Sequence, residues 1–502
     1  MSLTSTSIAG KKILVTAYDL EQSEHRGIAV YTKALIHCLR QAGAEIWLLT
    51  EFGEPLKSPG LKSLPDTTQE IIRNARVLDS LARGQSNKLP NTLQRKLRLS
   101  SLSIYLKNTL TLIVELLKRP RHYRNKSFYQ FRLNQLVDSP YPRLERLSYL
   151  KDVEGIVCAF RLFLSSQVAA GLRHQKPVHI DLRGFDALIT SCPLNIAANH
   201  LPIFVQTVHD LIPLEYIAHN ENPLIFSHRL QACLPARRLF VSQSTAKKFN
   251  QHIHKLKQKK SHKSQQSVII QPPSLHFPEW ITADPDRICD LRPVSHLLSN
   301  DNPYSNTSNQ LSNVLRPFRY FLFNSSIEPR KNLLFLAQAY SESNLSSQGI
   351  QLCVTGKLKR DDYSKAVESI VKHEPGILLT NYVDESTKRD LYLNALGLVS
   401  PSLVEGFGIP VLDSACLGMP TIASDCESHL EIQAMKDFKD SVLTVNTLKS
   451  NDWAAAMESI AGINNDLWQN SPKERKRRIS RYEKLKNQFY DKLQSDLEQI
   501  LN

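Results

Sequence analysis

Residues 401–432 constrain the fold more than any other part of the sequence, because they read as a strand, a glycine loop, a helix and a second strand. An apolar run leads into a loop that contains Gly406 and Gly408. Pro410 then opens a helical pattern, which Gly418 ends before the next apolar run. Such a loop presents backbone N–H groups at the N-terminus of a helix, and this arrangement favours a phosphate group.

Two carboxylates accompany this loop. Glu405 precedes the glycines, and Asp413 lies about two helical turns further along. A carboxylate does not attract a phosphate, but it accepts hydrogen bonds from hydroxyls such as those of a ribose or a hexose. Phosphate and hydroxyl recognition together indicate a nucleotide sugar as the ligand.

The segment resembles the signature of glycosyltransferase family 4, which is a glutamate, G-F-G-x-P and a second acidic residue, with seven positions between the two acidic residues. The resemblance implies the GT-B fold, an α/β architecture of two Rossmann-like doubly wound domains facing a cleft. It also implies that Glu405 holds sugar hydroxyls, that Gly406, Phe407 and Gly408 bind the donor, and that Asp413 binds the ribose. The family usually has glutamate where this chain has Asp413, whose side chain is one methylene shorter.

A second loop carries cations. The predicted strand 318–324 is followed by Glu328-Pro329-Arg330-Lys331-Asn332 and then by a helical pattern. Each cation at a helix N-terminus is unfavourable by roughly 0.3–1 kcal/mol unless an anion is bound. The segment resembles the E-P-R-K-N of family 4, which implies that Lys331 contacts the donor diphosphate and that Arg330 shares the charge. A solvated basic loop is the alternative.

Strands and helices alternate with short connections throughout residues 318–460, as a doubly wound sheet requires. Ser428 and Glu431 have the spacing of a capping box and predict the start of one of these helices.

The N-terminal half opens in the Rossmann manner, with a strand at 12–17, a loop, a helix at 28–42 and a strand at 44–50. The loop resembles the family's G-I-G-x-Y opening, and this places Gly27 at the substrate. A strand at 203–207 leads into His209 and Asp210, which resembles the family's H-D-L-I-P. The resemblance implies that His209 contributes to the sugar pocket, with Asp210 beside it. Taken alone, a His-Asp pair is more often structural.

The predicted division is an N-terminal acceptor domain at 1–300, a linker at 301–317, a nucleotide-sugar domain at 318–475 and a final helix at 476–502 that returns to the first domain. Within the first domain, residues 53–180 depart from the α/β pattern and are interpreted as a basic insertion. Their stretch 92–118 predicts a basic amphipathic helix. Such a helix contacts an anionic membrane surface, or packs on the domain with solvated ends.

The composition of the chain limits the classes of ligand and the cellular location that we expect for it. The chain has 502 residues and a net charge of +15, which suits phosphorylated substrates, anionic lipid or nucleic acid; a soluble basic enzyme is the alternative. No nucleic-acid module is evident. None of the eight cysteines forms a C-x-x-C pair, which favours a reducing compartment. Without a hydrophobic signal core or a membrane-spanning run, the expected location is cytoplasmic, with peripheral contact at the inner membrane face as an option.

The resemblance therefore predicts a retaining transferase that moves a hexose from a nucleotide-diphosphate sugar to a glycan, a lipid-linked or a small-molecule acceptor. Glu405, His209 and Lys331 are its predicted catalytic residues. The resemblance implies that no cofactor and no metal are needed, and the sequence agrees with the absence of a metal in that it shows no convincing D-x-D. The alternative is a catalytically silent GT-B protein that binds glycans or serves in assembly. Asp413, and Ser325 where some relatives have an arginine, favour that alternative.

Overall fold

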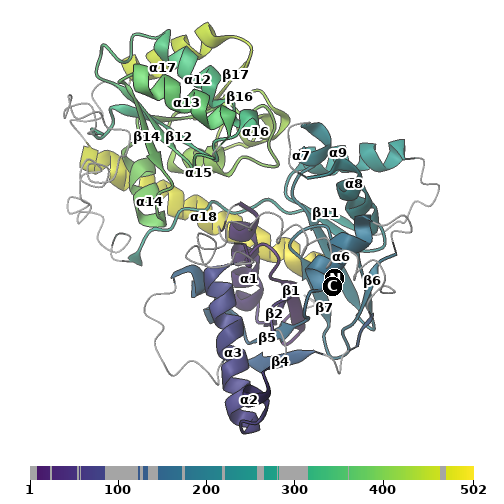
Figure 1. Cartoon of the computed structure of the whole chain (residues 1–502). Helices are drawn as coiled ribbons and strands as arrows, with labels where there is room; N and C mark the ends of the chain where they lie inside the picture. The colour runs from purple at the N-terminus through teal and green to yellow at the C-terminus, as the bar shows by residue number, and fades with distance from the viewer. Residues whose placement is uncertain are drawn as a thin grey trace, which may run out of the picture. The chain divides into compact units, whose positions relative to one another are not determined.

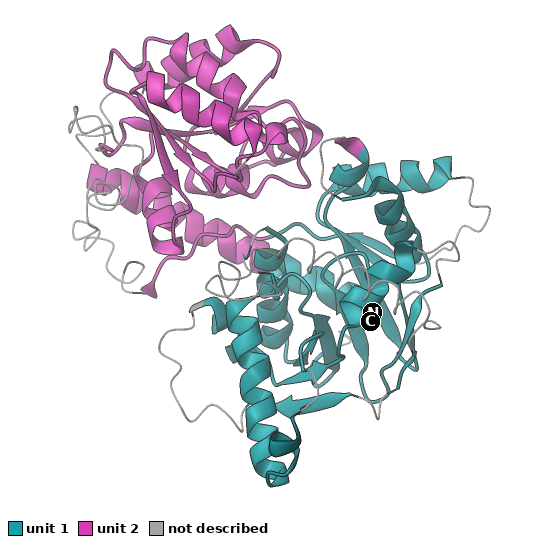
Figure 2. Ribbon diagram, in the orientation of Figure 1, with its two compact units in different colours: residues 1–214, 219–271, 491–502 teal, residues 215–218, 272–490 magenta. Residues whose placement is uncertain are grey.

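The computed structural model describes residues 8–22, 25, 27–53, 56, 58–84, 122–124, 128–133, 145–171, 176–216, 221–256, 265–279, 281, 315–359, 361–463 and 471–502. They form two compact units, shown in Figure 2. Unit 1 comprises residues 1–214, 219–271 and 491–502, and unit 2 comprises residues 215–218 and 272–490. The chain thus enters unit 2 after Gln271, before the predicted linker at 301–317, of which residues 301–314 lie outside the described part.

Unit 1 is built on an eight-stranded sheet in the order β11-β10-β9-β7-β1-β2-β5-β4. All neighbouring strands are parallel except the edge pair β4 and β5. Parallel strands are buried on both faces, and their sequences are accordingly continuous apolar runs such as KILVT in β1. The strands are β1 (Lys12–Thr16), β2 (Glu45–Thr50), β4 (Tyr129–Arg132), β5 (Gly155–Cys158), β7 (Ala187–Thr190), β9 (Ile203–Val208), β10 (Arg237–Phe240) and β11 (Gln266–Val268).

The remaining elements of unit 1 surround this sheet (Figure 1). A second, three-stranded sheet contains β3 (His122–Tyr123), β6 (Val178–Asp181) and β8 (Ile196–Asn199). The helices are α1 (Gly27–Gln41), α2 (Pro59–Lys62), α3 (Asp66–Arg83), the 3-10 helix η2 (Glu145–Asp152), α6 (Leu162–Gly171), α8 (Pro223–Ala232) and α9 (Gln243–Lys255), with α7 (Ile212–Glu215) at the border of the two units.

The segment interpreted as an insertion is not a separate block. β5 lies inside residues 53–180, yet it pairs with β2 in the main sheet, with Leu48 opposite Ile156. The sequence-based interpretation missed this strand, GIVC, because the residues around it in 53–180 do not show the alternation of strands and helices. The basic stretch at 92–118 lies outside the described residues.

Unit 2 has a six-stranded, wholly parallel sheet in the order β14-β13-β12-β15-β16-β17. Its strands are β12 (Tyr320–Asn324), β13 (Gln351–Thr355), β14 (Ile377–Asn381), β15 (Gly397–Ser400), β16 (Thr421–Ser424) and β17 (Val442–Val445). Its helices are α12 (Leu333–Ser341), α13 (Asp362–His373), α14 (Glu385–Asn394), α15 (Ile409–Leu417), α16 (Glu427–Gln433), α17 (Ser450–Ile463) and α18 (Ser471–Leu501). Counted along the chain, the strand order is 3-2-1-4-5-6, the Rossmann order.

The core of unit 2 lies between its sheet and the helices α12, α13 and α17 (Figure 1). Phe321 and Phe323 of β12 point into this core, together with Leu336 of α12 and Trp453 of α17. Helices α14 and α15 lie on the opposite face of the sheet (Figure 1). The predicted α/β class with two Rossmann-like doubly wound units is confirmed.

The end of α18 belongs to unit 1, where Lys11 Nζ donates to the carbonyl of Leu501 at 3.0 Å. Within the described part of the chain, no helix combines the length and the apolar character that a bilayer span requires.

Candidate functional site

The strand order of unit 2 reverses between β12 and β15, and such a switch point is where parallel α/β sheets place ligands. The loops that follow these two strands carry the predicted donor residues. Residues 325–332 follow β12, and residues 401–408 follow β15. The two loops are joined directly, because the backbone N–H of Leu403 donates to the carbonyl of Arg330 at 2.8 Å.

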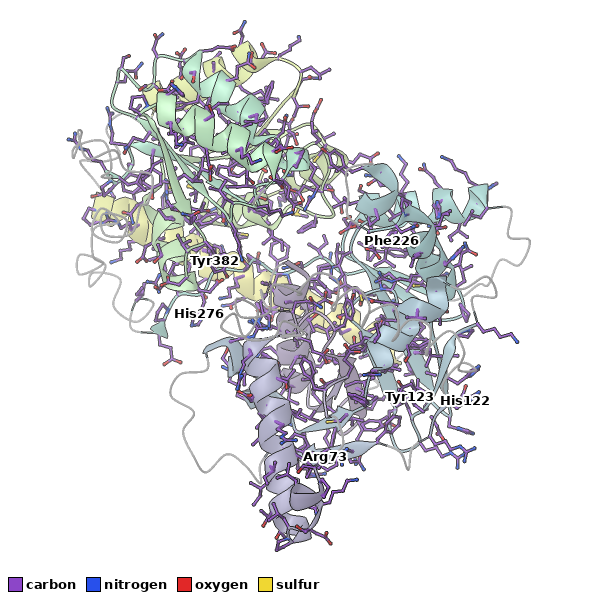
Figure 3. All side chains as sticks on the ribbon, in the orientation of Figure 1. Arg73, His122, Tyr123, Phe226, His276 and Tyr382 are labelled. Carbon is purple, nitrogen blue, oxygen red and sulfur yellow. The ribbon has the colours of Figure 1, made fainter. Side chains whose placement is uncertain are left out.

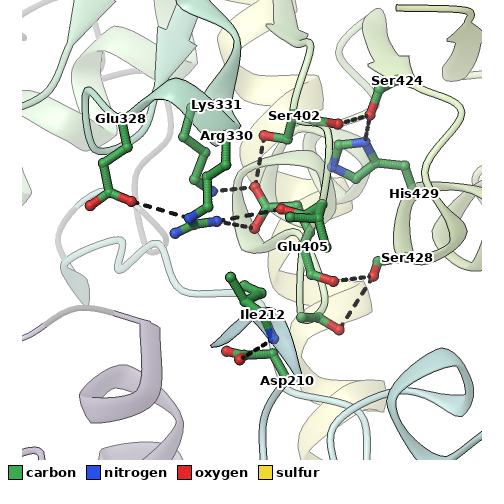
Figure 4. A network of polar contacts seen from close by, with 12 residues as sticks. Asp210, Ile212, Glu328, Arg330, Lys331, Ser402, Glu405, Ser424, Ser428 and His429 are labelled. Carbon is green, nitrogen blue, oxygen red and sulfur yellow. Dashed lines mark hydrogen bonds and ion pairs between the residues drawn. The ribbon is translucent and has the colours of Figure 1, made fainter. Parts of the chain in front are cut away.

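Glu405 and Lys331 form an ion pair at this switch point (Figure 4). Their side chains are only 11% and 8% exposed. Arg330 Nη1 lies 3.5 Å from the second carboxylate oxygen of Glu405, and the Ser402 hydroxyl donates to the first at 2.8 Å. Burial opposes ionisation of Glu405, but Lys331 and Arg330 outweigh it and lower the pKa of Glu405 to about 2. The structure therefore brings three predicted site residues into one charged cluster.

The cations of this cluster lie just before α12, at the start of the helix as predicted. Arg330 and Lys331 belong to a 3-10 turn, and Asn332, in the left-handed region at φ 57°, separates them from the helix. Arg330 Nε also donates to Glu328 at 3.1 Å, and Glu328 accepts from Lys359 at 2.7 Å. The carboxylates of Glu328 and Glu405 thus compensate the charges of Arg330 and Lys331. Because Lys331 is buried, this segment is not the solvated basic loop that was the alternative interpretation.

The glycine turn after Glu405 requires its glycine at 408. Gly408 has φ 101° and caps α15, and a Cβ there would lie 2.9 Å from the ring of His429. Phe407 beside it is buried. The hydroxyl of Ser428 donates to the carbonyl of Glu405 at 2.7 Å and fixes the start of the turn.

His429 is a member of this cluster that sequence reasoning missed. The Ser424 hydroxyl donates to the carbonyl of Ser402 at 2.6 Å, so His429 Nδ1 is the donor in its 2.9 Å bond to Ser424. Nε2 of His429 is therefore a bare acceptor. It is buried without a hydrogen-bond partner, on the side of the ring toward Glu405 (Figure 4). Burial lowers the pKa of His429 to about 4.

The predicted capping box is wrong. Helix α16 begins at Glu427 behind Cys426, so Ser428 lies inside its first turn, and no side chain caps the helix. The Ser428 hydroxyl is used by the Glu405 carbonyl instead. A motif read from spacing alone could not show this competing partner, which comes from a distant loop.

Asp413 lies on α15, but its carboxylate faces other segments of unit 2. It is 2% exposed. Oδ1 accepts from the backbone N–H of Ser274 at 2.6 Å and from the Tyr482 hydroxyl at 2.8 Å, and Oδ2 accepts from the Ser274 hydroxyl at 2.5 Å. Burial raises its pKa. The ribose role of Asp413 stays a prediction, although its oxygens already have these three donors.

The predicted residues of unit 1 lie at the carboxyl ends of their own strands. His209 follows β9 and is 8% exposed; its Nε2 donates to the carbonyl of Ser191 at 2.8 Å, and its ring meets Tyr31 edge to face. Burial lowers the pKa of His209 to about 4. Asp210 accepts from the backbone N–H of Ile212 at 3.0 Å, and Gly27 is the first residue of α1.

Asp19, which sequence reasoning also missed, lies beside Ser191, the hydrogen-bond partner of His209. The Ser191 hydroxyl donates to Asp19 at 2.6 Å, and burial raises the pKa of Asp19 to about 7. The position of these residues in the sequence could have indicated this contact. Asp19 follows β1 and Ser191 follows β7, and the strand order of the unit 1 sheet reverses between these two strands.

Among the residues that the structure describes, no group of three or more His, Cys, Asp or Glu side chains could hold a metal ion. Metal independence stays a prediction.

Comparisons with known proteins found one similar sequence segment, several similar folds and one family model that matches part of the chain. An O-antigen chain mannosyltransferase B from Escherichia coli is 31% identical over 115 residues, which are 22% of this chain and 30% of that protein. Among solved structures, sucrose-phosphate synthase from Thermosynechococcus elongatus is similar with a TM-score of 0.49 and 14% identity, over 94% of both chains. HepE of Anabaena, solved with UDP and glucose, gives 0.48 and 12% identity, over 97% of this chain and 100% of that one. Residues 312–484, which contain Lys331, Glu405 and Asp413, match the family model of glycosyl transferases group 1.

Proposed function

We propose that this protein is a retaining glycosyltransferase of the family 4 type, which moves a hexose from a nucleotide-diphosphate sugar to a glycan, a lipid-linked or a small-molecule acceptor without a metal. The observation that carries the proposal is the buried ion pair of Lys331 and Glu405 at the switch point of a Rossmann-like sheet. The family match of residues 312–484 supports it independently.

The ion pair has the properties that are expected of an anion-binding site. A buried lysine requires a negative partner, and in this structure Glu405 supplies it to Lys331. A diphosphate carries more charge than one carboxylate and also accepts hydrogen bonds from backbone N–H groups at the glycine turn. On donor binding, Lys331 exchanges Glu405 for the diphosphate, and the freed carboxylate accepts from sugar hydroxyls.

The same cations serve the chemical step. An acceptor hydroxyl forms a bond to the anomeric carbon while the bond from that carbon to the diphosphate oxygen breaks. The hydroxyl proton passes to the departing phosphate oxygen, which is the same-face course expected for retention. Negative charge grows on the leaving group, and Lys331 with Arg330 stabilises it. The contribution of His209 to the sugar pocket stays a prediction.

The mannosyltransferase relative supports a hexose as the transferred group, through a segment that spans 30% of that protein. We also propose a cytoplasmic location and peripheral contact with an anionic membrane, where a lipid-linked acceptor would be reached. The basic stretch at 92–118, on which membrane contact depends, lies outside the described residues. Flotation with liposomes that contain or lack anionic lipid tests that contact directly.

The test of the function is nucleotide-sugar hydrolysis by the purified chain across UDP-, GDP- and ADP-sugars. We expect hydrolysis of one donor class, and its loss in Lys331→Ala and in Glu405→Ala. Lys365→Ala is the matched control, because Lys365 is a surface cation of the same unit with a side chain that is 71% exposed. Hydrolysis that survives both site changes overturns the assignment, and inactivity toward every donor favours the silent GT-B alternative.

A further inference from the structure

Asp413 is held by a set of contacts that the donor site does not explain. Segment 272–277 follows Gln271, the last residue of unit 1 before the chain enters unit 2. Ser274 in this segment gives both its backbone N–H and its hydroxyl to the Asp413 carboxylate, at 2.6 and 2.5 Å. A buried carboxylate on the helix of the glycine turn is thus bonded to the segment by which the chain enters unit 2.

Tyr482 on α18 completes the arrangement. Its hydroxyl donates to Asp413 at 2.8 Å and accepts from the backbone N–H of Leu275 at 2.6 Å. Its ring packs edge to face on Phe277, with the centroids 5.2 Å apart, and Lys486 on the same helix donates to the carbonyl of Leu275 at 3.1 Å. Tyr482 is fully buried.

The segment itself is shaped for this contact. Leu275 and Phe277 are buried, while His276 between them is exposed (Figure 3). This alternation is that of an extended strand with one face against the protein. Helix α18 leaves unit 2 after Tyr490, so Asp413 joins α15 to the segment by which the chain enters unit 2 and to the helix by which it leaves.

We propose that Asp413 is a positioning residue, which clasps helix α15 to segment 272–277 and to α18, and that the donor ribose is bound without it. We call the contacts of Asp413, Ser274 and Tyr482 the clasp. The three donors take three of the roughly four acceptor positions of the carboxylate, two on Oδ1 and one on Oδ2. The turn at 406–408 begins the same helix, so the clasp sets its position. The ribose part of the proposal rests on the proposed function, whereas the clasp does not.

The short bonds of the clasp fit an aspartate. They measure 2.5–2.8 Å, and the side chain that makes them is 2% exposed. A glutamate there would displace Ser274 or Tyr482, and overpacking of this kind is destabilising.

The experiment compares Asp413→Asn, Asp413→Glu and Tyr482→Phe with the control Asp362→Asn, a carboxylate of the same unit whose side chain is 98% exposed. Calorimetry measures the binding of UDP and GDP and of their 2′-deoxy forms, and thermal unfolding is recorded for every variant. We expect Asp413→Asn and Asp413→Glu to lower the Tm by several degrees, and Asp362→Asn to leave it unchanged. The preference for ribose over 2′-deoxyribose should change by less than twofold in Asp413→Asn.

Coupling between the residues supplies a test that needs no nucleotide. The Tm losses of Asp413→Asn and Tyr482→Phe should be less than additive when combined, because both changes open the same clasp. Additive losses overturn the clasp. Loss of the ribose preference in Asp413→Asn, or tighter ribonucleotide binding in Asp413→Glu, overturns the ribose part. If the unaltered protein binds no nucleotide, the proposed function fails, and the clasp is judged on the Tm coupling. Should Asp413→Asn not fold, Ser274→Ala takes its place.

Discussion

Replacement of Lys331 by methionine removes the positive partner of Glu405 while keeping a side chain of similar length. The carboxylate then retains only Ser402 at 2.8 Å and Arg330 at 3.5 Å. Breaking a buried pair by removing one partner costs roughly 3–5 kcal/mol. Because Arg330 remains within reach, we expect a loss of about 2–4 kcal/mol in the free energy of unfolding at pH 7.

The pH dependence of this loss follows from the pKa of Glu405. In the unaltered protein it is about 2, below the ordinary 4.5, so Glu405 contributes stability above pH 4.5 that is lost as the pH falls from 4.5 to 2. Without Lys331 the burial of Glu405 favours its neutral form and raises its pKa. The deficit of Lys331→Met should therefore shrink as the pH falls from 7 to 5.

Urea denaturation at several pH values measures both effects, and the double variant Lys331→Met/Glu405→Gln is the control. With no buried charge left unpaired, the double variant should be more stable than Lys331→Met alone. A Lys331→Met variant as stable as the unaltered protein at every pH, or a double variant less stable than Lys331→Met, would refute the reasoning.

Three further predictions concern the neighbours of the pair. Gly408→Ala should cost about 1–3 kcal/mol in chemical denaturation, since φ is 101° and His429 is 2.9 Å from the new Cβ; Gly349→Ala, at φ 68° with open space, should cost less. The unaltered protein should lose at most about 3 kcal/mol of stability as the pH falls from 6.5 to 4, because His429 has a pKa near 4 when folded and near 6.5 when unfolded, so only the unfolded chain binds the proton in this range. His429→Gln should abolish this loss, and equal denaturation profiles for both proteins would contradict this. Arg330→Met should lower donor hydrolysis about 10–100-fold with little loss of stability, since Glu328 keeps Lys359 at 2.7 Å, and unchanged hydrolysis would remove Arg330 from the site.

The fold of unit 2 was predictable because its buried parallel strands are continuous apolar runs with short connections. YFLFN, QLCVT and GLVS each give a strand, and the glycine turn with Pro410 marks the start of α15. In unit 1 the strand β5 was missed because it lies within residues 53–180, which depart from the alternation of strands and helices, although it pairs with β2 in the main sheet.

The site was predictable where its residues lie in loops that directly follow strands of the switch point. Lys331, Arg330 and Glu405 meet for that reason. His429 and the clasp were not predictable, because each depends on contacts between distant parts of the sequence. Asp413 shows this most clearly, since its partners Ser274 and Tyr482 come from a segment and a helix far away along the chain.

The central claim is that a diphosphate takes the place of Glu405 beside Lys331, and titration calorimetry with UDP and GDP tests it most directly. Glu405→Gln removes the competing anion, so it should bind its nucleoside diphosphate at least as tightly as the unaltered protein does, while it loses hydrolysis of the nucleotide sugar. Lys331→Met should bind at least about tenfold more weakly, which corresponds to about 1.4 kcal/mol. Equal affinities in all three proteins, or weaker binding by Glu405→Gln, would contradict the claim.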